Sequence, residues 1–123
     1  MKSLLIVAHG SRKNTSNEEV KSLGDTISLS LQTDFSCVKV AFLEFASPSI
    51  EMALNALFDN GTSELIVLPY FLSAGKHVTT DLPEAVNTSM TMWPDRALQI
   101  LPHIGAMDLM VNLIVSASTT KSR

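Results

Sequence analysis

The chain alternates short, unbroken apolar runs with longer segments in which apolar residues recur every three or four positions. An unbroken run is typical of a β-strand covered on both faces, and the longer recurrence is typical of an amphipathic helix. The unbroken runs predict strands within residues 3–10, 36–44, 63–71 and 96–105. The periodic segments predict helices at residues 14–32, between Ser47 and Gly61, from Asp81 onward and at 107–115.

Local signals mark where these helices begin. Ser16 and Glu19 can form a capping box at the first helix, and Asp81 and Glu84 can do the same at the third. Ser47 is the expected N-cap of the second helix, because a proline follows it at the first helical position. These signals place each of the first three predicted helices between two predicted strands.

The last helix is expected to turn Met110, Val111 and Ile114 toward the core, and the polar residues that follow it are expected to fray.

The alternation of strands and helices predicts an α/β fold built from βαβ units. The commonest strand order for this pattern is 2-1-3-4, which gives a three-layer sandwich around a four-stranded, parallel, doubly wound sheet. We expect one domain at residues 1–118 and a polar tail at 119–123.

The composition agrees with a single compact domain, since 46% of the 123 residues are hydrophobic and 17% are charged. The net charge of −3 disfavours nucleic acid as the main partner, because a surface that follows phosphates normally has a cationic excess. The single cysteine, Cys37, is expected to pack as a small core residue in a reducing compartment. The first apolar run is too short for a signal peptide and no segment reaches the length of a membrane span, so we expect a cytoplasmic protein without a membrane partner.

Three residues that can bind metals or protons follow the predicted strands. His9 comes after the first strand, Glu44 after the second and His77 after the third. Ligands of such sheets gather beyond the carboxyl ends of the strands, so the three side chains can converge. Two imidazoles and a carboxylate suit Fe²⁺, Co²⁺, Ni²⁺ or Zn²⁺. The alternative that each is an ordinary hydrogen-bonded loop residue stays open, because no Cys-x-x-Cys, His-x-x-x-His or Gly-rich phosphate motif fixes the chemistry.

Four stretches carry a resemblance to a known family: "LLIVAHGSR", "VAFLEFASPSIEMAL", "VLPYFLSAGKHVTTDLPE" and "PHIGA". Their order and content resemble the small, single-domain class II chelatases that put cobalt or iron into sirohydrochlorin. The resemblance runs from Leu4 to about Met107, and its specific parts are F-L-E…P and F…G-x-H-V-x-x-D-L-P. It implies a chelatase-like or flavodoxin-like half domain.

The resemblance also implies roles for individual residues. His9 and His77 would hold the incoming divalent metal, which is Co²⁺ first by analogy and otherwise Fe²⁺ or Ni²⁺, and would accept the pyrrole protons. Glu44 would assist. The family works without ATP or an organic cofactor, and a homodimer is the expected active form. No iron–sulfur cluster is expected, because Cys37 is the only cysteine.

A sirohydrochlorin-type tetrapyrrole carries eight carboxylates and two removable pyrrole protons, so its site needs positive potential and a base. Arg12, Lys13 and Lys76 flank the two histidines, and helix N-termini near Ser16 and Asp81 would add N–H donors. Each charged residue can equally be a solvated surface position. The substrate-binding candidates are Ser11, Arg12, Tyr70, Phe71, Gly75, Lys76 and Thr79.

Within this set, Tyr70 and Phe71 are expected to form an apolar wall with Leu72 beneath the ring. Gly75 would allow either a close approach of the backbone to the ligand or a positive-φ turn. His103 also follows a strand, but a fourth strand lies farther from the switch point, and we do not assign this residue to the metal.

Two other functional classes remain open at this stage. A non-catalytic metal or tetrapyrrole carrier would use His9 and His77 for binding without promoting insertion. A flavodoxin-like regulatory or structural module would carry both histidines incidentally. Multiple turnover separates an enzyme from a carrier, and alanine variants that leave binding unchanged would indicate the module.

Overall fold

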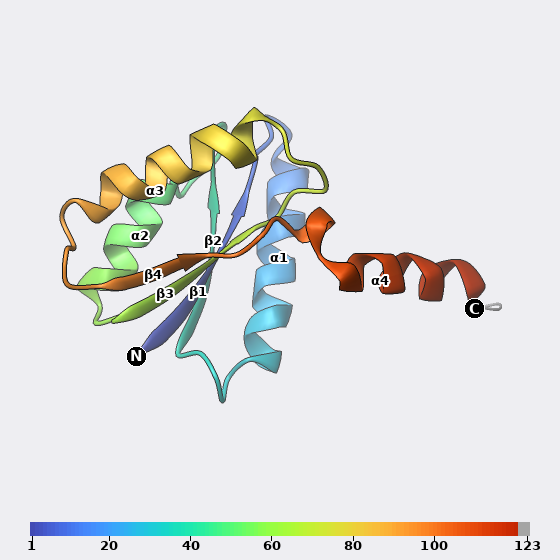
Figure 1. The fold of residues 1–123 in the computed structure, drawn as a ribbon, viewed down its shortest axis with the longest axis horizontal. Helices are drawn as coiled ribbons and strands as arrows, with labels where there is room; N and C mark the ends of the chain where they lie inside the picture. The colour runs from blue at the N-terminus through green and yellow to red at the C-terminus, as the bar shows by residue number, and fades with distance from the viewer. Residues whose placement is uncertain (121–123) are drawn as a thin grey trace.

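A computed structural model describes residues 1–120 of the chain, apart from the side chain of His77. Its centre is a four-stranded parallel sheet in the order β2-β1-β3-β4, as Figure 1 shows. The strands are β1 (Lys2–Ala8), β2 (Cys37–Phe42), β3 (Glu64–Pro69) and β4 (Ala97–Ile100). The predicted α/β class and strand order are therefore confirmed.

Helices cover both faces of the sheet, which makes the predicted three layers (Figure 1). Residues of β1 alternate between the faces: Leu5 and Val7 pack with α2 (Ile50–Asp59) and α3 (Leu82–Met90). Leu4 and Ile6 pack on the other face, with α1 (Asn14–Ser30). Because β1 is covered on both faces, its apolar run is unbroken in the sequence.

The start of α1 differs from the predicted capping box. The N-cap is Lys13, with no side-chain capping bond, and Ser16 lies inside the first turn, where its N–H reaches the carbonyl oxygen of Lys13 at 3.0 Å. The start at Asn14 agrees with the predicted range, but the chain is already helical at Ser16, so this residue is not the N-cap. Val20 and Ile27 do pack on the sheet, as the apolar stripe predicts.

The caps of α2 and α3 also differ from the prediction. Ser49, not Ser47, caps α2, and its hydroxyl accepts a hydrogen bond from Met52 N–H at 3.2 Å. The helix cannot begin sooner because the Pro48 carbonyl accepts from Phe42 N–H at 2.9 Å, which keeps this segment extended beside β2. Asp81 precedes α3 but makes no side-chain capping bond, because a π-helical turn, η1 (His77–Asp81), already brings the chain into helical conformation there.

The prediction for the last helix is wrong in its orientation. The helix α4 (Asp108–Thr119) follows a short 3₁₀ turn, η2 (Ile104–Ala106), and extends away from the sheet (Figure 1). Val111 and Ile114 are 63% and 55% exposed, so they do not face a core within the described residues. The helix also continues past Val115, where fraying was expected. Of the predicted tail, residues 121–123 lie outside the described part of the chain.

None of the helices in residues 1–120 combines the length and the apolar character needed to cross a lipid bilayer. Cys37 is partly buried against the core and forms no disulfide.

Candidate functional site

The site is centred on His9 and Glu44, which lie next to each other just beyond the carboxyl ends of β1 and β2. Nε2 of His9 is 2.7 Å from Oε2 of Glu44. The two side chains are 41% and 43% exposed, while the Nε2 atom between them is covered, so a ligand can reach the outer part of each side chain. The structure therefore brings together two of the three residues that the sequence predicts at this edge.

Backbone hydrogen bonds explain why these two residues meet. The parallel ladder of β1 and β2 continues past the last strand residues: Leu43 N–H donates to the Ala8 carbonyl and Glu44 N–H to the His9 carbonyl, both at 3.0 Å. Gly10 then lies at φ +95°, and a Cβ added there would lie 1.8 Å from the carbonyl oxygen of Glu44. Only glycine fits this approach, which keeps the His9 and Glu44 loops in contact.

The side chain of Asn17 fixes the loop that follows His9. It is buried in the first turn of α1, accepts a hydrogen bond from Ser11 N–H at 2.9 Å and donates one to the Ser11 carbonyl at 2.7 Å. The Ser11 hydroxyl accepts from Lys13 N–H at 3.0 Å. Ser11 and Asn17 therefore position the loop. Asn17 was not predicted from the sequence. The available signal was a polar residue three positions before Val20, on the side of the helix that carries its apolar residues.

Phe45 is a second residue that the sequence analysis missed. Its ring meets the His9 imidazole edge-on, with centroids 6.1 Å apart and planes at 77°. The guanidinium carbon of Arg12 lies 4.8 Å from the centre of the Phe45 ring. Phe45 has φ +67°, a left-handed conformation that costs a non-glycine residue about 1–2 kcal/mol. The available signal was an aromatic residue directly after the F-L-E stretch, where the second strand has ended.

The loop after β3 carries the predicted apolar wall, and its three residues differ in environment. Tyr70 is 37% exposed, Phe71 is partly buried against the core and Leu72 is 70% exposed. Phe71 also accepts a hydrogen bond from Gly105 N–H at 2.9 Å, which ties this loop to η2. Phe71 is thus mainly a packing residue, whereas Tyr70 and Leu72 present surface to solvent.

The segment around Gly75 adopts a turn that leads into η1. The Gly75 carbonyl accepts from Val78 N–H and Thr79 N–H, both at 3.1 Å, and also from the Thr79 hydroxyl at 3.1 Å. Gly75 does not have a positive φ, so this part of the prediction is wrong, because the turn is closed by ordinary helical hydrogen bonds. A Cβ at Gly75 would meet nothing within 4 Å, so the backbone here is open. Its close approach to a ligand stays a prediction.

The His77 side chain lies outside the described part of the structure, so its convergence with His9 stays a prediction. Among the side chains that are described, no three His, Cys, Asp or Glu residues form a group that could hold a metal ion. The basic candidates Arg12, Lys13 and Lys76 are all exposed, as expected for groups that attract an acidic ligand from solvent.

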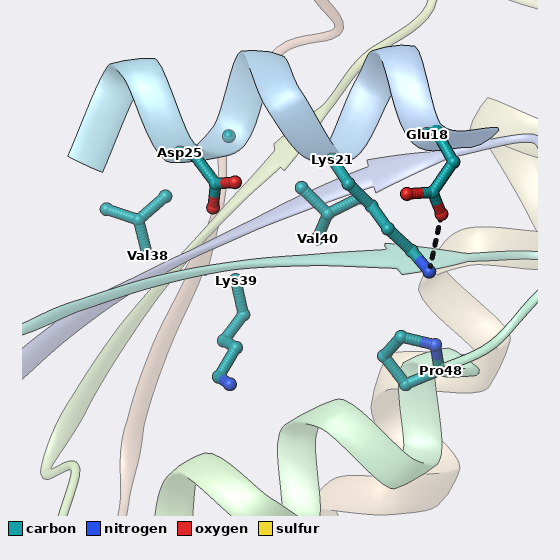
Figure 2. Close-up of a pocket in the computed structure, with 8 residues that line it drawn as sticks. Glu18, Lys21, Asp25, Val38, Lys39, Val40 and Pro48 are labelled. Carbon is teal, nitrogen blue, oxygen red and sulfur yellow. Dashed lines mark ion pairs between the residues drawn. The ribbon is translucent and has the colours of Figure 1, made fainter. Parts of the chain in front are cut away.

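Two cavities lie away from this edge of the sheet. One, of about 370 Å³, lies between α1 and β2, and Figure 2 shows its lining. Its charges are mixed: Lys21 lies 3.5 Å from Glu18, whereas the Lys39 side chain leaves β2 on the side away from α1 (Figure 2). A second cavity, of about 340 Å³, lies between α2 and α3. Neither is lined by His9 or Glu44, so both are separate from the candidate site.

Comparisons with known proteins agree with this fold. A CbiX protein of Marinobacter aquaeolei VT8 superposes with a TM-score of 0.79 at 21% identity, over 96% of this chain and 94% of that one. The sirohydrochlorin chelatase SirB of Bacillus subtilis subspecies spizizenii, solved in complex with cobalt, superposes with a TM-score of 0.78 at 24% identity. This second match covers 95% of this chain and 49% of SirB.

Comparisons of sequence give the family. The sirohydrochlorin cobaltochelatase of Methanocaldococcus jannaschii is 34% identical over 83 residues, which are 68% of this chain and 57% of the relative. The sirohydrochlorin ferrochelatase of Priestia megaterium is 26% identical over 115 residues, which are 94% of this chain and 42% of the relative. The chain thus spans about half the length of these relatives. The model of the CbiX family matches residues 3–120, and the chain therefore belongs to the CbiX family.

Proposed function

We propose that this protein is a sirohydrochlorin chelatase, an enzyme that inserts a divalent metal into the macrocycle with Co²⁺ ranked first and Fe²⁺ or Ni²⁺ as further substrates. The observation that carries the proposal is the His9–Glu44 pair, 2.7 Å apart and open at the carboxyl edge of the sheet, in a chain of the CbiX family. Relatives named as cobaltochelatases and ferrochelatases support the reaction and leave its metal undecided.

The chemistry requires a base near the metal. The free macrocycle exchanges two pyrrole protons for one M²⁺, so two protons must leave as the metal–nitrogen bonds form. His9 takes one of these protons, and Glu44 at 2.7 Å stabilises the imidazolium that results. In this proposal His9 and His77 hold the incoming metal before it enters the macrocycle. Because metal–nitrogen bonds replace metal–water bonds and the protons pass to solvent, the step needs no ATP or organic cofactor.

The experiment is anaerobic absorption spectroscopy of sirohydrochlorin with each metal, at catalytic concentrations of protein. We expect multiple turnovers above the uncatalysed rate, lost in His9→Ala and in His77→Ala. His103→Ala is the matched control, because it removes a histidine near another strand end that has no role in the proposed step. Binding without turnover by a folded protein would instead establish a carrier, and no acceleration with any metal would overturn the enzyme.

We further propose that the active form is a homodimer, and α4 supports this. Five of its apolar side chains are 55–73% exposed: Leu109, Val111, Leu113, Ile114 and Val115. A free helix of this length is marginal in water, so its apolar surface needs a cover. At 100° per residue these side chains lie on more than one side of α4, so a partner that packs on one side covers part of this surface. Together with the surface that receives the helix, two copies would bury on the order of 1,000 Å², which is the lower bound for a specific interface.

The chain itself offers a surface that such a helix can cover. On one face of the sheet α1 packs against β2, while Leu68 of β3 and Leu101 after β4 are only partly buried on the same face. A second copy would place its α4 there and receive the first copy's α4 in return, as two-fold symmetry requires. The double length of some relatives is consistent with a unit built from two such domains.

Light scattering after size exclusion tests the dimer. We expect twice the chain mass for the wild type at about 100 μM and the monomer mass for Leu113→Asp, which puts a charge into the apolar face of α4. Met92→Asp changes an apolar residue outside α4 that is at least as exposed, and this variant should remain dimeric. A monomeric wild type at that concentration would contradict the proposal.

A further inference from the structure

Phe45 combines a costly backbone conformation with an exposed aromatic ring. Among the residues that the structure describes, it is the only one other than glycine with a positive φ, at +67°. Its side chain is 50% exposed, whereas Phe42 and Phe58 are almost completely buried. Burial therefore does not compensate for the conformation, and glycine or asparagine would satisfy the backbone better. Residues held in this way cluster at functional sites.

The contacts of the Phe45 ring also indicate a functional role. One neighbour of Phe45 is the His9 imidazole, met edge-on, and the other is the Arg12 guanidinium, which lies over the ring at 4.8 Å. Arg12 forms no ion pair with a carboxylate among the described residues. Its five N–H donors are therefore available to an anion, while the aromatic ring restricts where the guanidinium lies.

The Arg12–Phe45 pair thus presents an apolar surface and a cation beside the proposed base. A ligand that satisfies both groups has a flat, apolar body and carboxylates on its edge. A hydrated metal ion would be repelled by the guanidinium, and a small anion would use Arg12 alone. The Phe45 ring contacts the His9 imidazole, but neither Phe45 nor Arg12 is a partner in the His9–Glu44 ion pair, so we expect their main effect on ligand binding.

We propose that Phe45 and Arg12 form a recognition element for a macrocycle rich in carboxylates, with the Phe45 ring packing against its apolar surface and Arg12 binding a peripheral carboxylate. The choice of macrocycle rests on the proposed function. The pair sets substrate affinity and discrimination, whereas His9 and Glu44 set the rate of the chemical step.

Binding of sirohydrochlorin without metal, followed by its fluorescence, tests the pair directly. We expect Kd to rise about tenfold in Phe45→Ala and in Arg12→Gln, with Phe45→Tyr within about twofold of the wild type. Because Arg12 rests on Phe45, the double variant should lose less than the product of the single losses. Leu29→Ala, which removes an exposed apolar side chain from α1, should leave Kd unchanged.

Phe45→Gly separates the ring from the backbone, since glycine adopts this φ without cost. It should lose as much affinity as Phe45→Ala while its resistance to urea equals or exceeds that of the wild type. In steady-state assays the Phe45 and Arg12 variants should raise KM with little change in kcat. They should also lose most of their preference for sirohydrochlorin over a dicarboxylate porphyrin.

The outcomes distinguish this inference from the proposed function. A wild type that binds and chelates, with unchanged Kd in both single variants, would overturn the recognition element alone. A wild type that binds sirohydrochlorin but does not chelate would overturn the enzyme, and the Kd of the variants would still decide the inference. A wild type that does not bind sirohydrochlorin at all would overturn both.

Discussion

Two loops at the same edge of the sheet are built in opposite ways. The loop after β1 is tied to the residues that follow β2 by extended ladder hydrogen bonds, by the fit of Gly10 under Glu44 and by the buried side chain of Asn17. The loop after β3 is exposed from residue 72 to residue 76, and Gly75 has open space around it. The loop after β1 is therefore fixed, which suits a residue that acts as a base. The loop after β3 is open, which suits the entry of a large ligand.

The largest effect should come from breaking the chemistry on the fixed side. His9→Ala removes the proposed base and should lower kcat at least 100-fold, because general base catalysis typically contributes that much or more. Steady-state rates with sirohydrochlorin and Co²⁺ measure this, with His103→Ala as the control. A loss below about threefold in His9→Ala would show that this histidine does not take the proton.

A pair of glycine variants tests the difference in packing between the two loops. Gly10→Ala should lower the free energy of unfolding by about 3 kcal/mol, because its Cβ meets the Glu44 carbonyl oxygen and its φ is positive. Gly75→Ala should change it by less than about 0.5 kcal/mol, since no atom lies within 4 Å and φ is not positive. Urea denaturation measures both. Equal effects would mean that the loops are equally constrained.

Asn17→Ala should have a smaller effect on stability, about 1–2 kcal/mol, because it removes two hydrogen bonds to Ser11 and leaves those backbone groups to find water. It should also lower kcat, since the loop that carries His9 loses a tether. Asn17→Asp keeps the acceptor for Ser11 N–H and should recover part of the stability. An Asn17→Ala protein with unchanged stability would show that the loop is held by other contacts.

The smallest effect requires no substitution. Amide hydrogen exchange should be slower at Leu43 and Glu44, whose N–H groups donate to β1 carbonyls, than in residues 72–74 of the other loop. We expect a difference of at least about 100-fold in exchange rate, because exposed segments with few hydrogen bonds open at little cost. Mass spectrometry of overlapping peptides measures it. Similar rates in both loops would remove the contrast between them.

The sheet could be predicted from the sequence because buried parallel strands leave unbroken apolar runs, and the order 2-1-3-4 followed from the commonest connections. The helix starts were less predictable. Ser47 and Ser49 both suit an N-cap, and the choice depends on the hydrogen bond between Phe42 and Pro48, a contact with another element. The orientation of α4 was predicted wrongly for a related reason, since none of its residues is buried within the described chain.

The candidate site was predictable where it depends on strand ends. His9 and Glu44 follow adjacent parallel strands, so topology alone brings them together. Phe45 was not predictable, because its role depends on a left-handed backbone conformation that residue type does not reveal. The use of Asn17 as a tether likewise depends on the path of the loop from β1 to α1.

The exposed apolar face of α4 also has a consequence for how the chain folds. A twelve-residue helix with no covered face has little stability of its own, so its helical content should depend on whether a second copy is bound. On dilution, the far-UV circular dichroism signal should then fall by the share that α4 contributes while the sheet stays folded. The chain would be a preformed α/β domain whose last helix folds only as it binds, and its order would be set by protein concentration.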